Sequence, residues 1–268
     1  MGAVTFSIDM ALVACLRQAL PLSQFIETGT FYGDTLAAAA DQFERLISIE
    51  SSAEIHQQAK RRFVNDEKIT VLHGDSPAVL ASIAQQFQGT PTLFWLDAHW
   101  CPEAGAVNGN GQCPLLRELR AIGSLHPQSV ILVDDARLFL APPPVPLEAS
   151  QWPGFSEVLQ ALCELSSVHE LMILNDIIVL YPRSIRAATD AFAIQHGIDW
   201  LSAFRAQAEL AKLLQQVQEK ELMIRRLDEE LRKRMPIRAL KGEFMHWSGV
   251  TKALFRAILG RIGLSGQP

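Results

Sequence analysis

The chain has 268 residues, of which 49% are hydrophobic and 20% are charged, with 16 Gly, 14 Pro and 4 Cys. This length suits one large domain or a domain with an appendage, and the composition excludes a wholly disordered chain, a collagen-like repeat and a disulfide-stapled scaffold. The formal net charge of −5 argues against a nucleic-acid binder for the chain as a whole.

The charge is unevenly distributed along the chain. Residues 201–268 carry 13 Lys and Arg against 7 Asp and Glu, a net charge of +6. Residues 1–200 carry the remaining 11 basic and 22 acidic residues, a net charge of −11. The sequence therefore predicts two electrostatically different parts that join near residue 200. For the basic part alone, an anionic surface stays open as a partner.

The start of the chain lacks the features of a targeting segment. No Lys or Arg precedes Arg17, and Phe6 stands where a myristoylation signal needs Ser or Thr. No uncharged apolar run reaches the roughly 18 residues of a membrane span. The four cysteines form no CxxC pair. These features favour a reducing cytoplasm, with peripheral contact at the inner membrane face as a further option.

Apolar runs typical of β-strands alternate with helical stretches in the first 200 residues. After a short amphipathic helix over residues 9–20, we expect strands at 23–27, 45–50, 69–72, 92–97 and 129–134, and helices at 34–43, 52–63, 77–87, 114–123 and 155–165. Such alternation indicates a parallel sheet that is covered on both faces. Two further strands, at 169–175 and 176–181, meet at Asn175-Asp176. They must form an antiparallel hairpin, because a parallel crossover needs about a dozen residues.

Residues 201–235 have the periodicity of a coiled coil. One set of residues recurs every seven positions and a second set falls three later: Leu210, Val217, Ile224 and Leu231, then Leu213, Lys220, Leu227 and Arg234. This repeat predicts a homo-oligomer, and the alternative is a long helix packed on its own domain. Residues 236–268 form a basic tail with an amphipathic helix at 247–264. That helix suits a membrane surface, a partner groove or the protein's own body.

The segment 27–35, E-T-G-T-F-Y-G-D-T, lies between the first strand and the next helix. Glycines let its backbone turn sharply and approach a ligand, and α/β sheets bind ligands at the carboxyl ends of parallel strands. Neither GxGxxG nor GxxxxGK[ST] is present, and the loop has no Lys for a phosphate. The acid at its start, Glu27, suits a cationic or hydroxyl-rich ligand better.

Two more polar positions follow the next strands. Glu50 ends the second strand, where an acid can accept hydrogen bonds from both hydroxyls of a ribose. Gly74-Asp75-Ser76 follows the third strand and suits an adenine amino group. Three such positions in register on consecutive strands indicate a nucleoside-binding site rather than ordinary solvated strand ends.

In these motifs, over about residues 20–182, the chain resembles the class I S-adenosylmethionine (SAM)-dependent methyltransferases. The resemblance implies a Rossmann-like seven-stranded sheet of order 3-2-1-4-5-7-6, with the last-numbered strand antiparallel. It also implies SAM as the cofactor, with Glu27 and Gly29 near its amino-acid end. The residues expected to bind it are Glu27, Gly29, Thr30, Phe31, Gly33, Thr35, Glu50, Ser51, Asp75, Ser76 and Asp97. Within this class the chain looks closest to bacterial small-molecule and sugar O-methyltransferases.

Acids also follow the fourth and fifth strands, in the segments 97–100 (DAHW) and 134–137 (DDAR). Neighbouring carboxylates repel unless they share a proton or a cation such as a divalent metal ion. Resemblance to metal-dependent O-methyltransferases implies that Asp97, Asp134 and Asp135 hold Mg²⁺ or another divalent cation, which would lower the pKa of the attacking acceptor oxygen. His99, or Asp97 free of metal, would then accept the proton.

Several alternatives stay open at this site. Asp134 and Asp135 could instead cap the following segment, and Asp97 could contact the cofactor without a metal. The residues His99, Cys101 and Cys113 could hold zinc, although their spacing fits no common zinc motif. The Gly/Asn-rich loop at 101–113 could act as a substrate lid, and the Pro-rich segment 141–153 as a substrate wall or a plain connector.

The sequence thus predicts a SAM-dependent O-methyltransferase that acts on a small hydroxylated acceptor, such as a sugar, and does not bind nucleic acid. Its domains are expected at 1–200, 201–235 and 236–268. One alternative is a hydroxylase-like reaction on the same fold, which a single nearby His disfavours. Another is a non-enzymatic, oligomeric scaffold that is recruited to a membrane.

Overall fold

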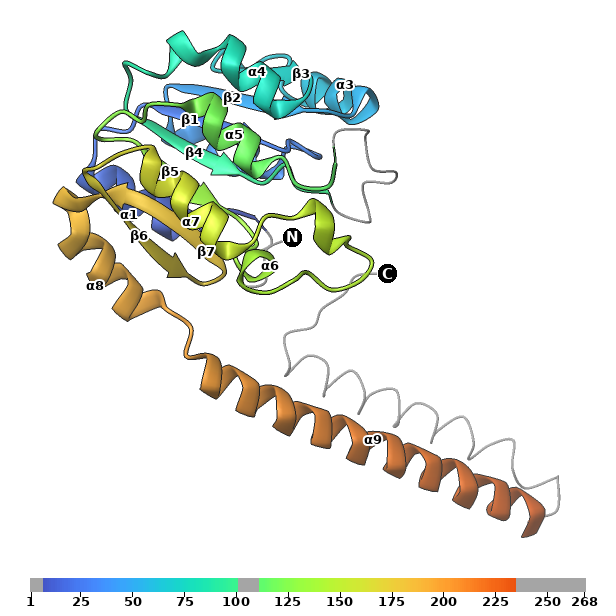
Figure 1. Ribbon diagram of the computed structural model, residues 1–268. Helices are drawn as coiled ribbons and strands as arrows, with labels where there is room; N and C mark the ends of the chain where they lie inside the picture. The colour runs from blue at the N-terminus through green and yellow to red at the C-terminus, as the bar shows by residue number, and fades with distance from the viewer. Residues whose placement is uncertain (1–6, 101–110, 235–268) are drawn as a thin grey trace. The chain divides into compact units, whose positions relative to one another are not determined.

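A computed structural model describes residues 7–100 and 111–234 (Figure 1). The predicted basic tail (236–268) and residues 101–110 of the predicted lid lie outside these ranges. The chain divides into two units, the first ending at Ile198 and the second beginning at Asp199. This division falls close to the expected change of domain near residue 200.

The first unit is built on one seven-stranded sheet. Its strands are β1 (Gln24–Thr28), β2 (Arg45–Glu50), β3 (Ile69–His73), β4 (Thr92–Leu96), β5 (Val130–Val133), β6 (His169–Leu174) and β7 (Ile177–Pro182). Their spatial order is β3-β2-β1-β4-β5-β7-β6. The first five strands pair in parallel, whereas β7 runs antiparallel to both β5 and β6. The predicted sheet, which is that of the class I methyltransferase fold, is confirmed.

Helices cover both faces of this sheet, which explains why the strands read as continuous apolar runs. One face carries α1 (Met10–Ala19), α2 (Asp34–Ala39), α3 (Ala53–Arg62) and α8 (Arg186–His196). The other carries α4 (Ser76–Ser82), α5 (Leu115–Ile122), α6 (Arg137–Leu140) and α7 (Phe155–Glu164) (Figure 1). Alternate strand residues divide between the two cores, so that Phe25 and Trp95 pack on the first face and Ile26 and Phe94 on the second.

Local chemistry sets the helix starts that the sequence predicts. The Asp9 side chain accepts hydrogen bonds from the backbone N–H groups of Ala11 and Leu12, and so caps α1. Ser52 caps α3 in the same way through the N–H of Ile55. Two predicted helices are shorter than expected, because α2 and α4 each give way to a 3-10 turn, at Ala40–Gln42 and Ala84–Gln86.

The sequence analysis misses two helices of the first unit. Only Thr189 and Phe192 of α8 are buried, so its apolar face is too narrow to show a clear periodicity. The four-residue α6 begins at Arg137, the last residue of the segment 134–137 that was read as an acid motif, and continues beyond it to Leu140.

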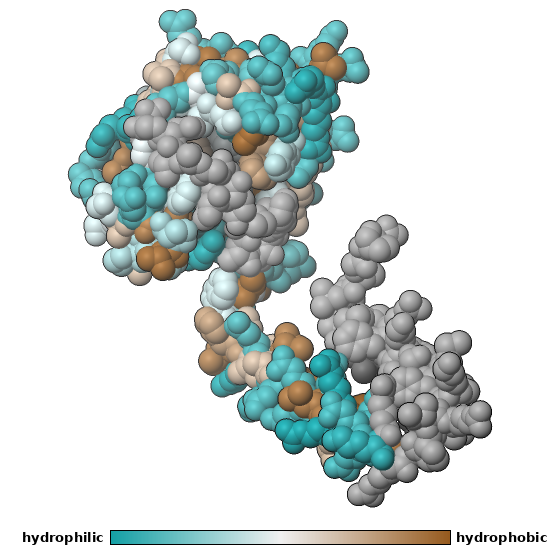
Figure 2. All heavy atoms as spheres, turned by 90° about the vertical axis from the view of Figure 1, so that its right-hand side faces the viewer, coloured by the Kyte–Doolittle hydropathy of each residue, from teal (hydrophilic) through white to brown (hydrophobic). Residues whose placement is uncertain are grey.

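The second unit begins with α9 (Trp200–Arg234), a single helix of 35 residues. The long helix predicted from the heptad repeat is therefore present. Its large apolar residues are exposed, from 43% at Val217 to 65% at Phe204, and Figure 2 shows apolar residues scattered among hydrophilic ones. Among the helices of the described ranges, none is long and apolar enough to span a membrane.

Candidate active site

The predicted site residues come together at one edge of the sheet, as expected. Glu27 lies in β1 and Glu50 is the last residue of β2. Asp97 directly follows β4, and Asp134 directly follows β5. Asp75 comes shortly after β3, which ends at His73. Parallel pairing of these strands places all five carboxylates at the carboxyl edge, which is where α/β sheets bind ligands.

The loop after β1 approaches the loop after β4 so closely that only glycine fits at its centre. Gly29 has φ +86°, and a Cβ placed there would lie 2.3 Å from the carbonyl oxygen of Asp97. Its N–H donates a hydrogen bond to the carbonyl of Ile49 (2.9 Å). The N–H of Gly33 closes the turn on the carbonyl of Thr30 (2.9 Å). These two hydrogen bonds and the close contact with Asp97 fix the conformation of the loop.

Glu27 is a buried carboxyl group held by hydroxyls. The Ser48 hydroxyl donates to Glu27 Oε2 (2.5 Å) and lies 2.6 Å from the hydroxyl of Thr30. Burial raises the pKa of Glu27 to about 8, although the hydrogen bond from Ser48 opposes this shift. The ion pairs formed within the described ranges do not include Glu27. A cation that reached this pocket would gain a carboxylate partner, and this fits a ligand with a cationic end.

Glu50 is held at the edge of the same loop. Its Oε2 accepts a hydrogen bond from the N–H of Phe31 (3.0 Å), and its Oε1 accepts one from the N–H of Ser52 (2.8 Å). Each carboxylate oxygen can accept a second hydrogen bond. Glu50 is thus oriented and still able to accept hydroxyls, which fits the ribose role predicted for it.

Two residues of α5 hold the segment after β3, and sequence reasoning missed both. Arg117 Nη1 lies 2.9 Å from Asp75 Oδ2. The Ser76 hydroxyl donates to Oε1 of Glu118 (2.5 Å), a buried acid whose pKa burial raises to about 7. The available signal was an acid within the apolar run of residues 115–122. Asp75 and Ser76 are therefore positioned by α5 and not only by their own strand.

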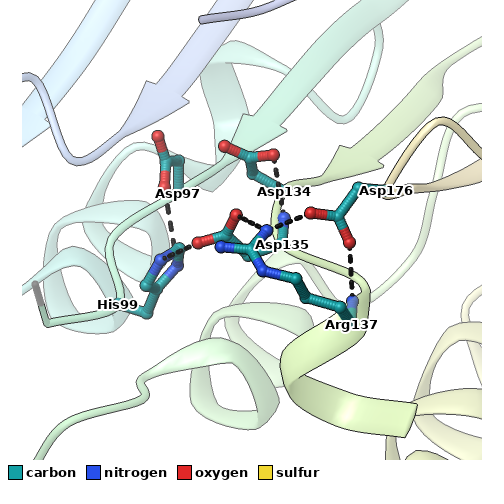
Figure 3. A network of polar contacts seen from close by, with 6 residues as sticks. All are labelled: Asp97, His99, Asp134, Asp135, Arg137 and Asp176. Atoms are coloured by element: carbon teal, nitrogen blue, oxygen red, sulfur yellow. Dashed lines mark hydrogen bonds and ion pairs between the residues drawn. The ribbon is translucent and has the colours of Figure 1, made fainter. Parts of the chain in front are cut away.

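His99 lies between two of the predicted acids (Figure 3). Its Nε2 is 2.8 Å from Asp135 Oδ2, and its Nδ1 is 3.5 Å from Asp97 Oδ1. Burial lowers the pKa of His99, but the bond to Asp135 and the charge of Asp97 outweigh burial and raise it. The structure therefore joins the two predicted catalytic residues, Asp97 and His99, to Asp135.

Arg137 closes the other side of the cluster, together with an acid that the sequence analysis read only as part of a turn. Arg137 Nη1 is 2.5 Å from Asp135 Oδ1 and also contacts Asp176 Oδ2. The backbone N–H of Arg137 donates to Asp176 Oδ1 (2.8 Å). Burial tends to raise the pKa of Asp135, but His99 and Arg137 together lower it.

Asp134 stands apart from these pairs. Its Oδ1 accepts a hydrogen bond from the N–H of Asp135 (2.8 Å). Burial, and then the negative charges of Asp97 and Asp135, raise its pKa to about 7. A proton on Asp134 would relieve the repulsion within the cluster, and this is one of the two resolutions considered from the sequence.

The predicted metal site on Asp97, Asp134 and Asp135 is not supported. Within residues 7–100 and 111–234, no group of three or more His, Cys, Asp or Glu side chains is arranged to hold a metal ion. Both oxygens of Asp135 already contact nitrogen atoms of His99 and Arg137. These residues do not fit a divalent ion. The zinc alternative includes Cys101, which lies outside the described ranges.

The Pro-rich segment 141–153 packs beside His99. The ring of Trp152 lies 5.5 Å from the imidazole, centroid to centroid. Gln112 Oε1 accepts hydrogen bonds from Trp152 Nε1 (3.0 Å) and from the N–H of Glu148 (2.8 Å). Trp152 is buried, so it packs against His99 and is not free to stack on a sugar. The segment fits the predicted role of a wall beside the site.

Comparisons with known proteins give distant likenesses. No protein-family model and no curated protein matches the chain. A SAH-bound methyltransferase from Podospora anserina is 14% identical, with a TM-score of 0.45 over 65% of this chain and 76% of that chain. A SAM-bound amino pentose methyltransferase from Micromonospora echinaspora is 12% identical, with a TM-score of 0.42 over 65% and 89%. A spermidine synthase from Thermotoga maritima is 11% identical, with a TM-score of 0.38 over 63% and 55%. Similarity at this level does not identify a reaction.

Proposed function

We propose that the protein is a SAM-dependent methyltransferase that methylates a hydroxyl group of a small acceptor, such as a sugar. The observation that carries this proposal is the convergence of Glu27, Gly29 and Glu50 at the carboxyl ends of β1 and β2. Glu27 is a buried acid that forms no ion pair within the described ranges, Gly29 brings the backbone close, and Glu50 is an oriented second acid. Together they suit a ligand with a cationic end and a ribose.

Different residues of the chain would bind the different parts of such a cofactor. Glu27 and Gly29 would hold its amino-acid end, Glu50 its ribose, and Asp75 with Ser76 its adenine. When bound, SAM would supply a methyl group on a sulfonium sulfur, and the acceptor oxygen would attack this methyl carbon in line as the sulfur leaves. Positioning of the two reactants therefore provides much of the rate. Glu50 contributes to positioning because two backbone N–H groups fix its carboxylate.

His99 is the proton acceptor in this proposal. Asp135 engages Nε2, which leaves Nδ1 as the nitrogen that can take the proton of an acceptor hydroxyl. The positive charge that develops on the ring is stabilised by Asp135, as in other His–carboxylate pairs. Asp97, 3.5 Å from Nδ1, can receive the proton afterwards. Trp152 packs against the ring and helps to keep it in place.

Calorimetric titration with SAM tests the proposal directly. We expect the wild-type chain to bind SAM and Glu50→Ala to bind it at least about tenfold more weakly, because a charged hydrogen-bond acceptor is lost. Glu54→Ala, an exposed acid four residues further on, is the matched control and should bind like the wild type. Absence of binding at millimolar SAM, or equal affinities of the two variants, would contradict the proposal. Incubation with candidate sugars and mass spectrometry then reports a gain of one methyl group.

We also propose that α9 joins copies of this chain through a coiled coil. Two observations support this: the seven-residue repeat, and the exposure of Leu210 (49%) and Leu227 (49%), which belong to it. A cytoplasmic location, with the tail at a membrane surface, stays a prediction from the sequence.

A further inference from the structure

The cluster around His99 contains its own permanent cation. Arg137 Nη1 contacts the carboxylates of both Asp135 (2.5 Å) and Asp176, and these two acids are each only 5% exposed. The remaining oxygen of Asp176 accepts the backbone N–H of Arg137 (2.8 Å), and the remaining oxygen of Asp135 contacts His99 (2.8 Å). All four carboxylate oxygens are therefore engaged.

This arrangement competes with a divalent metal ion. Such an ion takes about six or more oxygen ligands, of which one or more are carboxylate oxygens. At this site nitrogen atoms of Arg137 and His99 lie against the carboxylate oxygens that it would use (Figure 3). A metal ion beside Asp135 would also lie next to the guanidinium charge, and like charges at this separation repel strongly when they are partly buried.

The backbone is shaped to keep Arg137 in place. Asp135 (φ 55°) and Asp176 (φ 71°) both adopt the left-handed conformation, which Asp adopts more readily than most residues and which the two-residue turn between β6 and β7 requires of Asp176. The N–H of Ala136 also donates to the carbonyl of Asp176 (2.7 Å). Three contacts thus fasten the segment after β5 to the turn between β6 and β7, and the guanidinium bridges the two carboxylates at that junction.

We propose that Arg137 is the resident cation of this acid cluster: it holds Asp135 against His99 and keeps divalent metal ions out. Arg137 is in this view a positioning residue. The consequence that His99 accepts its proton without a metal rests on the proposed function, whereas the exclusion of metal does not.

Mn²⁺ binding, followed by the electron paramagnetic resonance signal of the free ion, tests this proposal on the full chain without cofactor or acceptor. We expect the wild type to leave the signal unchanged. Arg137→Ala, which vacates the space between the carboxylates, should bind Mn²⁺ at least about tenfold more tightly, because ligand charge tunes affinity. Adding Asp135→Asn to Arg137→Ala should abolish the gain. Arg186→Ala, at an exposed arginine paired with Glu170, is the matched control and should behave like the wild type.

Two results would overturn the proposal: Mn²⁺ binding by the wild type that Asp135→Asn removes, or a folded Arg137→Ala that binds no more tightly than the wild type. Circular dichroism verifies folding. Arg137→Gln, which keeps hydrogen-bond donors but not the charge, takes the place of Arg137→Ala if that variant unfolds, and the same criteria apply. Because no methyl transfer is measured, a failure of the proposed function would leave this result unaffected.

Discussion

Gly29→Ala should disable the site through a single added methyl group. The new Cβ would lie 2.3 Å from the carbonyl oxygen of Asp97 and 3.1 Å from Cα of Ala98. Contacts of Cβ atoms shorter than 3.0 Å essentially do not occur, so the loops after β1 and β4 must separate by about 0.7 Å. The φ of +86° adds a conformational cost of about 1–2 kcal/mol for alanine.

Together these effects should lower the free energy of unfolding by about 2–3 kcal/mol and weaken SAM binding by more than about tenfold. Urea denaturation and calorimetric titration measure the two quantities. Gly89→Ala is the control, because a Cβ at that position meets nothing within 4 Å. Equal stability and equal SAM affinity of the two variants would refute the close approach of the β1 loop to Asp97.

Four further predictions concern Glu27, the proposed proton acceptor and the second unit. Because the pKa of Glu27 is about 8 and a cationic ligand favours its ionised form, SAM affinity should rise by up to roughly tenfold per pH unit below that value and level off above it. Glu27→Gln should remove this dependence in calorimetric titrations, and a rise that persists in the variant would assign it to another group. Without cofactor, the same raised pKa means that the folded state holds the proton more tightly, so the contribution of Glu27 to the free energy of unfolding should fall as pH rises from about 4.5 toward 8. His99→Gln should lower kcat by about 10²–10⁴-fold with SAM affinity little changed, and an unaltered kcat would exclude His99 as the base. A chain that ends at residue 198 should show a lower oligomeric mass in light scattering than the full chain, and an unchanged mass would exclude α9 as the oligomerisation element.

The strands and the acids at their ends could be predicted because each depends on a short stretch of sequence. A run such as 45–50 is apolar because both faces of the sheet are covered, and the acid that ends it stands at the edge where parallel strands finish. The order of the strands then decides which acids meet. The positions of Glu27, Glu50 and Asp97 followed from these two facts.

The neutralisation of the acid cluster could not be predicted in this way. Asp176 lies 39 residues after Arg137, in a dipeptide whose composition indicates only a turn. Its side chain reaches the site because β7 lies between β5 and β6, and because both Asp135 and Asp176 adopt positive φ values that their residue type does not demand. Glu118 was missed for a related reason. Its partner, Ser76, lies after β3, and the contact between them depends on how α5 packs against that strand end.

The position of Asp176 has a consequence for how the protein matures. The residues proposed to bind the cofactor at the ends of β1, β2 and β3 lie within the first 76 residues, whereas the salt-bridged cluster needs the turn that precedes β7, the last strand to leave the ribosome. β7 then inserts between two strands that are already synthesised, a pairing between distant parts of the chain that is slow to form. A nascent or truncated chain that ends before this turn would therefore have the loops after β1, β2 and β3 without the charge-balanced cluster around His99, so the proposed proton-transfer centre would assemble last.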